Sequence, residues 1–231
     1  MPKVNQEYVA EKEKSIVDAA IRVCKFKPAY AVTLRDVVKE CGISQGGLYH
    51  YFTDIDEIFA EILNRSFEEN KVDENEYKIF ESNNPLDEII LTSFAILGQL
   101  IDNMTNQYGS LIFELNSIYL HEPERGMKAA SRIKNHNDME AFIDKIFNLI
   151  ETHIAKDDIE LAVSKEHLML LVNVTMQGIQ QSVTFSQKSY GKENTYSIGN
   201  ERTTAKNMMI ILAHSINGLL RISKPKIKND A

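Results

Sequence analysis

The segment from Thr33 to Phe52 constrains the fold of this 231-residue chain more than any other part of it. Thr33 can cap a helix by accepting a hydrogen bond from an amide of its first turn, and Asp36 places negative charge near the positive end of that helix. Gly42 favours the left-handed backbone that ends a helix, and Ser44 is a second potential cap. These closely spaced signals predict two helices joined by a tight turn.

The second of these helices, Gln45 to Tyr51, is short and carries Gly46 and Gly47. Glycine in place of alanine costs a helix about 1 kcal/mol per residue. This cost is offset if the helix approaches another molecule closely, because a first turn without side chains can place its free amides against a phosphate or the floor of a groove. The paired glycines therefore indicate contact with another molecule.

Helices are also predicted on both sides of this segment. Apolar residues recur at three- and four-residue intervals between Lys12 and Phe26, and Pro28 is expected to end that helix. A further helix over about 54–69 begins with Thr53 or Asp54 as its cap, and both registers fit the sequence. The charge-rich, poorly periodic residues 68–81 mark a domain boundary.

Beyond residue 85 the pattern is helical throughout, without alternating strand runs. We expect an all-α fold of about nine helices, in which residues 1–53 form the unit that contains the helix-turn-helix, helix 54–69 connects, and residues 70–231 form a larger helical domain. The five helices expected in that domain run from Leu86 to Met104, Gln107 to His121, Glu124 to Ile154, Lys165 to Lys188 and Glu201 to Ile222.

The charge is divided unevenly along the chain. The formal net charge is -7, but residues 1–52 carry eight Lys and Arg against six acidic residues, so this part is at +2 and the remaining 179 residues are at -9. A mildly basic N-terminal unit on an acidic body is compatible with phosphate contact at one end. No apolar run is long enough for a membrane span or signal peptide, so we expect a cytoplasmic protein. Cys24 and Cys41 are expected to be buried reduced thiols, with a redox switch as the alternative.

Three short sequences carry a resemblance to a known family. They are Thr33-Leu34-Arg35-Asp36-Val37-Val38, Cys41-Gly42-Ile43-Ser44 and Gly46-Gly47-Leu48-Tyr49-His50-Tyr51-Phe52. Together they resemble the N-terminal motif of the TetR/AcrR family of bacterial repressors. The resemblance covers about the first 65 residues. It implies an all-helical homodimer with a three-helix helix-turn-helix DNA-binding domain and a C-terminal domain for effector binding and dimerisation.

The resemblance also implies that the short third helix lies in the major groove, and this placement assigns roles to its residues. Gln45 is then the best candidate for base recognition, because its amide can pair bidentately with adenine. Tyr49, His50 and Tyr51 match positions that touch phosphates, with packing in the core as the alternative for each. The full set of expected DNA-binding residues is Thr33, Arg35, Ser44, Gln45, Gly46, Gly47, Tyr49, His50 and Tyr51.

The sequence departs from the family pattern at three positions. Ile55 stands where a lysine usually contacts phosphate, Pro28 where a glycine commonly ends the first helix, and Cys24 where a phenylalanine usually packs. The missing lysine should lower the salt dependence of DNA binding by roughly one counterion per subunit.

Two functions are expected of the C-terminal domain. The last two helices, about 165–188 and 201–222, match the seam of a four-helix bundle formed by two copies, although some of their apolar residues will fill the monomer's core. Aromatic and methionine side chains suit either a pocket for a hydrophobic effector or a plain core. The candidate pocket residues are Phe94, Met104, Phe113, Tyr119, Met139, Phe142, Met176 and Gln180.

An enzyme is the rival class, but no catalytic residues are predicted. The chain lacks Gly-x-Ser-x-Gly, a phosphate-binding glycine loop, His-Glu-x-x-His and any Glu-x-x-His pair, and its six histidines have no ligand spacing. No metal or cofactor is expected. An activator or a helical adaptor that uses the same DNA-binding unit is a further alternative, and the sequence names neither the effector nor the operator.

Overall fold

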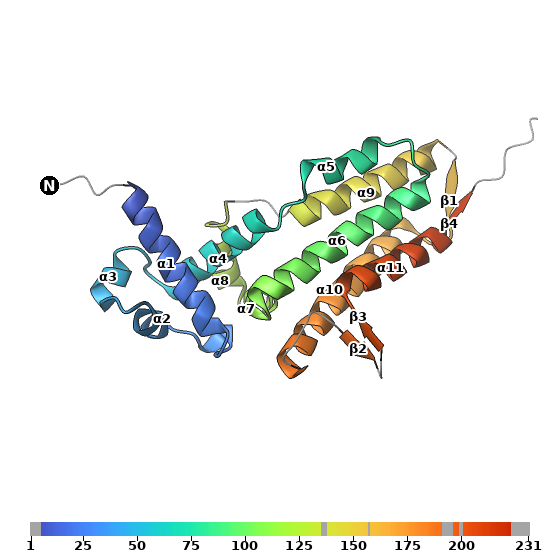
Figure 1. Cartoon of the computed structure of the whole chain (residues 1–231). Coiled ribbons are helices and arrows are strands. Elements are labelled where there is room, and N and C mark those ends of the chain that lie inside the picture. The colour runs from blue at the N-terminus through green and yellow to red at the C-terminus, as the bar shows by residue number, and fades with distance from the viewer. Residues whose placement is uncertain (1–5, 135–137, 157, 191–195, 199–200, 223–231) are drawn as a thin grey trace, which may run out of the picture. The chain divides into compact units, whose positions relative to one another are not determined.

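The computed structural model describes residues 6–134, 138–156, 158–190, 196–198 and 201–222, and these contain eleven α-helices, two short 3-10 turns and four short strands (Figure 1). The α-helices are α1 Gln6–Cys24, α2 Leu34–Cys41, α3 Gln45–Tyr49, α4 Ile55–Glu69, α5 Glu74–Tyr77, α6 Leu86–Tyr108, α7 Leu111–His121, α8 Pro123–Ala130, α9 Asp138–Ala155, α10 Lys165–Tyr190 and α11 Ala205–Leu219. The 3-10 turns are η1 Ala29–Ala31 and η2 Lys78–Glu81. The strands are β1 Ile159–Leu161, β2 Tyr196–Ile198, β3 Glu201–Thr203 and β4 Leu220–Ile222.

Residues 1–70 and 104–136 form one compact unit, here called unit 1. Its core gathers apolar side chains from helices α1 to α4 and from α7, and the largest of those that are fully buried are Ile16, Leu48, Ile58, Phe59, Ile62 and Leu115. The N-terminal helices therefore share one core with α7, which the sequence alone had assigned to the C-terminal domain.

Residues 71–103 and 137–231 form the second compact unit, unit 2. In it α6, α9, α10 and α11 lie alongside one another (Figure 1), around a core that includes Phe94, Phe142 and Leu168. Gly98 of α6 brings the helix backbones close together, because a Cβ at this position would lie 2.5 Å from the Cα of Lys206 at the start of α11.

The described residues contain eleven α-helices where about nine were expected, because the short α5 lies in the segment 68–81 and one expected helix is divided in two. The helix expected over Glu124 to Ile154 is two helices, α8 and α9, with a turn after Ala130. The helix expected from Glu201 begins at Ala205, where Thr204 accepts a hydrogen bond from the amide of Asn207 at 3.2 Å.

The four short strands were not predicted from the sequence. Strand β1 pairs antiparallel with β4, Ile159 opposite Ile222, and β2 pairs antiparallel with β3, Tyr196 opposite Thr203. Each strand has three residues, too few to show the two-residue alternation by which strands are recognised in a sequence. All-helical architecture is otherwise confirmed.

Candidate DNA-binding site

The turn between α2 and α3 has the hydrogen bonds that the sequence predicts. The hydroxyl of Thr33 accepts from the amide of Asp36 at 3.3 Å, while the Thr33 amide donates to the Asp36 carboxylate at 2.8 Å, a reciprocal capping box. Gly42 ends α2 with φ 68°, a left-handed conformation that costs little only for glycine. The hydroxyl of Ser44 then caps α3 by accepting from the amide of Gly47 at 3.1 Å.

The inner face of this motif is closed by apolar packing. Val37 and Leu48 are fully buried and Phe52 is 4% exposed, so all three are core residues. Tyr51 is half-buried and packs against the same core. Because the two caps and these side chains hold both helices, the orientation of α3 is determined locally.

The outer face of α3 is exposed to solvent. Gln45, Gly46 and His50 are exposed, and Tyr49 keeps 46% of its surface. A Cβ added to Gly46 would meet no atom within 4 Å, so no intramolecular contact requires glycine at this position. At Gly47 a Cβ would lie 3.2 Å from the Ser44 Oγ, so this glycine makes room for the cap.

Two of the basic residues around α2 form ion pairs with acidic residues of that helix, whereas Arg35 does not. Lys27 donates to Asp36 at 2.6 Å and Arg22 to Glu40 at 2.7 Å. The hydrogen bonds that Lys27 and Thr33 donate lower the pKa of Asp36 to about 2, so this carboxylate stays ionised as part of the cap. Arg35 is exposed, and no ion pair within the described part of the chain engages it.

Helix α4 begins in the register that uses Asp54 as its cap, accepting from the amide of Glu57 at 2.9 Å. The side chain of Glu57 in turn accepts from the amide of Thr53 at 2.7 Å. Ile55 is half-buried and packs against the unit 1 core. The Ile55 side chain therefore contacts the protein core, whereas a lysine at this position in the family pattern contacts a phosphate.

Three basic residues of α8 and the turn after it neutralise the acidic start of α4. Arg125 binds Asp56 through two hydrogen bonds of 2.8 and 3.0 Å, Lys128 pairs with Asp54, and Arg132 pairs with Glu57. We call these three pairs the α4–α8 ion-pair cluster. This cluster was not predicted from the sequence. The spacing of the three basic residues, which fits one helix face, is visible in the sequence, but their partners lie about 70 residues away.

The eight candidate pocket residues do not gather at one place. Met139, Met176 and Gln180 line a cavity in unit 2, whereas Phe94 and Phe142 are buried in the core of that unit. The other three, Met104, Phe113 and Tyr119, belong to unit 1.

Tyr119 has a structural contact in unit 1, because its hydroxyl lies 3.3 Å from Asp56 and donates to it. Burial, followed by the charge of Asp56, raises the pKa of this tyrosine well above its usual range. Burial likewise raises the pKa of the half-buried Cys24 thiol to about 12. Neither group titrates near neutral pH.

The described residues contain neither a metal-binding cluster nor a membrane-spanning helix. No group of three or more His, Cys, Asp or Glu side chains there is arranged to hold a metal ion. Within the same residues, none of the helices has the length and apolar character that a membrane span requires.

Comparison with known sequences identifies the N-terminal region. The sequence model for "Bacterial regulatory proteins, tetR family" matches residues 16–62, which include the second half of α1, all of α2 and α3, and about half of α4. The chain is also 38% identical over 68 residues to an uncharacterized HTH-type transcriptional regulator, YfiR, of Bacillus subtilis (strain 168). That match covers 29% of this chain and 33% of the relative, so the chain matches about a third of the relative's length.

Solved structures share the fold over nearly the whole chain. A TetR family transcriptional regulator from Pseudomonas syringae pv. tomato str. DC3000 superposes with a TM-score of 0.55 at 15% identity, covering 93% of this chain and 98% of that one. A putative TetR-family regulator from Rhodococcus sp. gives 0.53 at 14% identity, covering 90% and 98%. At these identities the comparison concerns the fold alone.

Proposed function

We propose that this chain, which belongs through its N-terminal domain to the TetR family of bacterial regulatory proteins, is a transcriptional repressor that binds a palindromic operator as a homodimer. The observation that carries the proposal is the exposed face of α3. Gln45 and Gly46 lie on the exposed side of a helix whose orientation is fixed by its caps and core. No contact within the protein requires a glycine at position 46. Residues 1–53 recognise DNA, helix 54–69 connects, and residues 70–231 serve dimerisation and effector binding.

The residues of this face have different roles in DNA binding. Gln45 recognises a base edge in the major groove, and Gly46 and Gly47 let the first turn of α3 approach the DNA closely. Tyr49 and His50 donate to phosphates, as does Arg35, whose guanidinium is exposed.

Three of the expected DNA-binding residues act mainly through the protein. The hydroxyls of Thr33 and Ser44 are engaged in helix caps, so these residues hold α2 and α3 in position. The half-buried Tyr51 supports the helix from the core side.

The dimer would form through α10 and α11. Large apolar side chains on these two helices are exposed, although most of the neighbouring ones fill the core of unit 2. The exposed ones are Leu170, Leu171, Val174, Phe185 and Ile211. Several large exposed apolar side chains on two neighbouring helices are typical of an interaction site, so a second copy is the occupant we propose.

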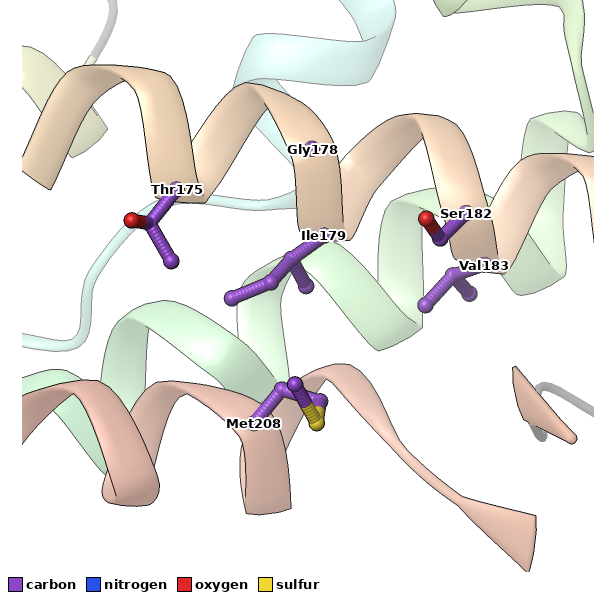
Figure 2. Close-up of a pocket in the computed structure, with 6 residues that line it drawn as sticks. All are labelled: Thr175, Gly178, Ile179, Ser182, Val183 and Met208. Atoms are coloured by element: carbon purple, nitrogen blue, oxygen red, sulfur yellow. The ribbon is translucent and has the colours of Figure 1, made fainter. Parts of the chain in front are cut away.

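A groove between the same two helices supports this interface. It has a volume of about 250 Å³, and Ile179 and Val183 of α10 point into it toward Met208 of α11 (Figure 2). Its α10 side also carries the small residues Thr175, Gly178 and Ser182, and a Cβ at Gly178 would meet no atom within 4 Å. Small residues let the backbone of a partner helix approach closely.

The regulatory mechanism we propose is a shift in population between two states. An effector bound in the C-terminal domain favours a state in which α4 has moved and the two recognition helices are wrongly spaced for the operator. A hundredfold preference of the effector for that state corresponds to about 2.7 kcal/mol.

The decisive experiment is a mobility shift with the DNA that flanks the chain's own gene, combined with light scattering. We expect sequence-specific binding that survives competitor DNA, and a dimer at micromolar concentration. Absence of specific binding would favour the adaptor alternative, and a monomer would overturn both the dimer and the palindromic operator. Reporter expression in a deletion strain separates repression from activation.

A further inference from the structure

A second groove, in unit 2, lies between α9 and α10 with α6 at its floor. Its volume is about 360 Å³, within the range of small-molecule sites. The buried side chains of Ile101 and Phe147 form part of the floor, and the half-buried Met139 and Met176 line it. The interior therefore favours an apolar ligand, and the flexible methionine side chains can adapt to its shape.

The two charged residues described at the rim of this groove are both acidic. Glu140 and Asp144 stand one turn apart on α9, and both are exposed. Among the described residues that line the groove there is no lysine, arginine or histidine. Within the residues that the structure describes, neither carboxylate is engaged in an ion pair. On the opposite side α10 contributes the side-chain amides of Asn173, Gln177 and Gln180, which are uncharged.

We propose that this groove binds lipophilic cations, and that such a cation is the effector. The second part rests on the proposed repressor function, whereas the first does not. Two carboxylates beside low-dielectric apolar walls create a negative potential that attracts a cation and repels an anion. The apolar body of the ligand would cover Phe147 and the methionines, whose sulfur atoms are polarizable.

Two ions of the same shape and opposite charge test the charge preference. The full-length chain is titrated by calorimetry with tetraphenylphosphonium and, separately, with tetraphenylborate. We expect tetraphenylphosphonium to bind at least tenfold more tightly, and its affinity to fall as salt is added. Equal affinities for the two ions, or tighter binding of the anion, would overturn the proposal.

Variants locate the site. E140Q/D144N should weaken tetraphenylphosphonium binding at least tenfold, because both carboxylates are removed while the shape of the groove is kept. D87N/E88Q is the matched control: it removes the same two charges from exposed positions at the start of α6, outside the groove, and should leave the affinity unchanged. If the two double variants lose affinity equally, the cation is attracted by overall charge and the proposed site is wrong.

The effector role is tested separately on the operator complex. We expect tetraphenylphosphonium to release wild-type protein from its operator but not E140Q/D144N. Charge-dependent binding in the groove without release would keep the cation site and overturn the effector role. A protein that is released by another compound and does not bind tetraphenylphosphonium would keep the repressor function and overturn the cation site.

Discussion

Acidic side chains have opposite surroundings at the start of α4 in unit 1 and along α9 in unit 2. Asp54, Asp56 and Glu57 begin α4, and each meets a basic residue of the α4–α8 ion-pair cluster. Glu140 and Asp144 on α9 face a groove whose described lining residues include no basic one. Paired carboxylates hold one part of a fold against another, whereas carboxylates without such a partner are available to a ligand. The contrast distinguishes charges that maintain the DNA-binding unit from charges that can recognise a cation.

The largest effect is expected from removing one basic residue of the α4–α8 ion-pair cluster. Arg125→Met should lower the free energy of unfolding by about 2 kcal/mol, because Asp56, 9% exposed, loses both of its guanidinium hydrogen bonds. Urea denaturation followed by circular dichroism measures it. The control is Lys134→Met, since the Lys134 side chain is 76% exposed in its pair with Glu61 and should contribute less than about 0.5 kcal/mol. Equal effects of the two substitutions would show that burial does not distinguish these pairs.

A smaller effect, opposite in sign for stability and for function, is expected at Gly46. Gly46→Ala should stabilise the protein by up to about 1 kcal/mol, because alanine is the better helix former and its Cβ would meet open space. The same change should weaken operator binding roughly tenfold by holding α3 away from the groove. Denaturation and mobility shift measure the two quantities. A variant that is more stable and binds the operator as well as wild type would remove the functional reason for this glycine.

The pH dependence of stability tests Asp36. Its folded pKa of about 2 lies below the unfolded value of about 3.9, so the unfolded state binds more protons between these values. The contribution is therefore fully present above about pH 4 and is lost as pH falls toward 2. It should amount to less than about 1 kcal/mol, because the pair with Lys27 is partly exposed. Denaturation of wild type and Asp36→Asn across this window should show a shallower pH dependence for the variant, and parallel curves would contradict the assignment.

The smallest change in stability is expected from E140Q/D144N. Because neither carboxylate has an ion-pair partner among the described residues, the free energy of unfolding should change by less than about 0.5 kcal/mol. Thermal denaturation compares the double variant with wild type. A loss as large as that of Arg125→Met would mean that these acids are structural, and the comparison between the two regions would fail.

The local features of the DNA-binding unit follow from the sequence. The caps at Thr33 and Ser44 and the left-handed Gly42 depend on residues a few positions apart, so residue type and spacing suffice to predict them. For α4 the sequence allowed two cap registers, and the structure uses the one with Asp54.

Features that depend on distant residues were not predictable. The partners of Asp54, Asp56 and Glu57 lie in α8 and the turn after it, and no periodicity in a single helix indicates which helix will pack beside it. Apolar patterning likewise could not separate Phe94 and Phe142, which fill the core, from Met139 and Met176, which line a groove. Residues that fill a core and residues that line a cavity are of the same types and occur at the same helical spacing.

Binding of a labelled operator followed by fluorescence anisotropy tests the central claim, recognition of DNA by α3, most directly. We predict that the wild-type chain binds the operator at least a hundredfold more tightly than a scrambled duplex at physiological salt. Gln45→Ala should weaken binding to the operator at least tenfold, and leave binding to the scrambled duplex unchanged, because the lost contact is to a base. Equal affinity of the wild type for both duplexes, or an unchanged operator affinity in Gln45→Ala, would contradict the claim.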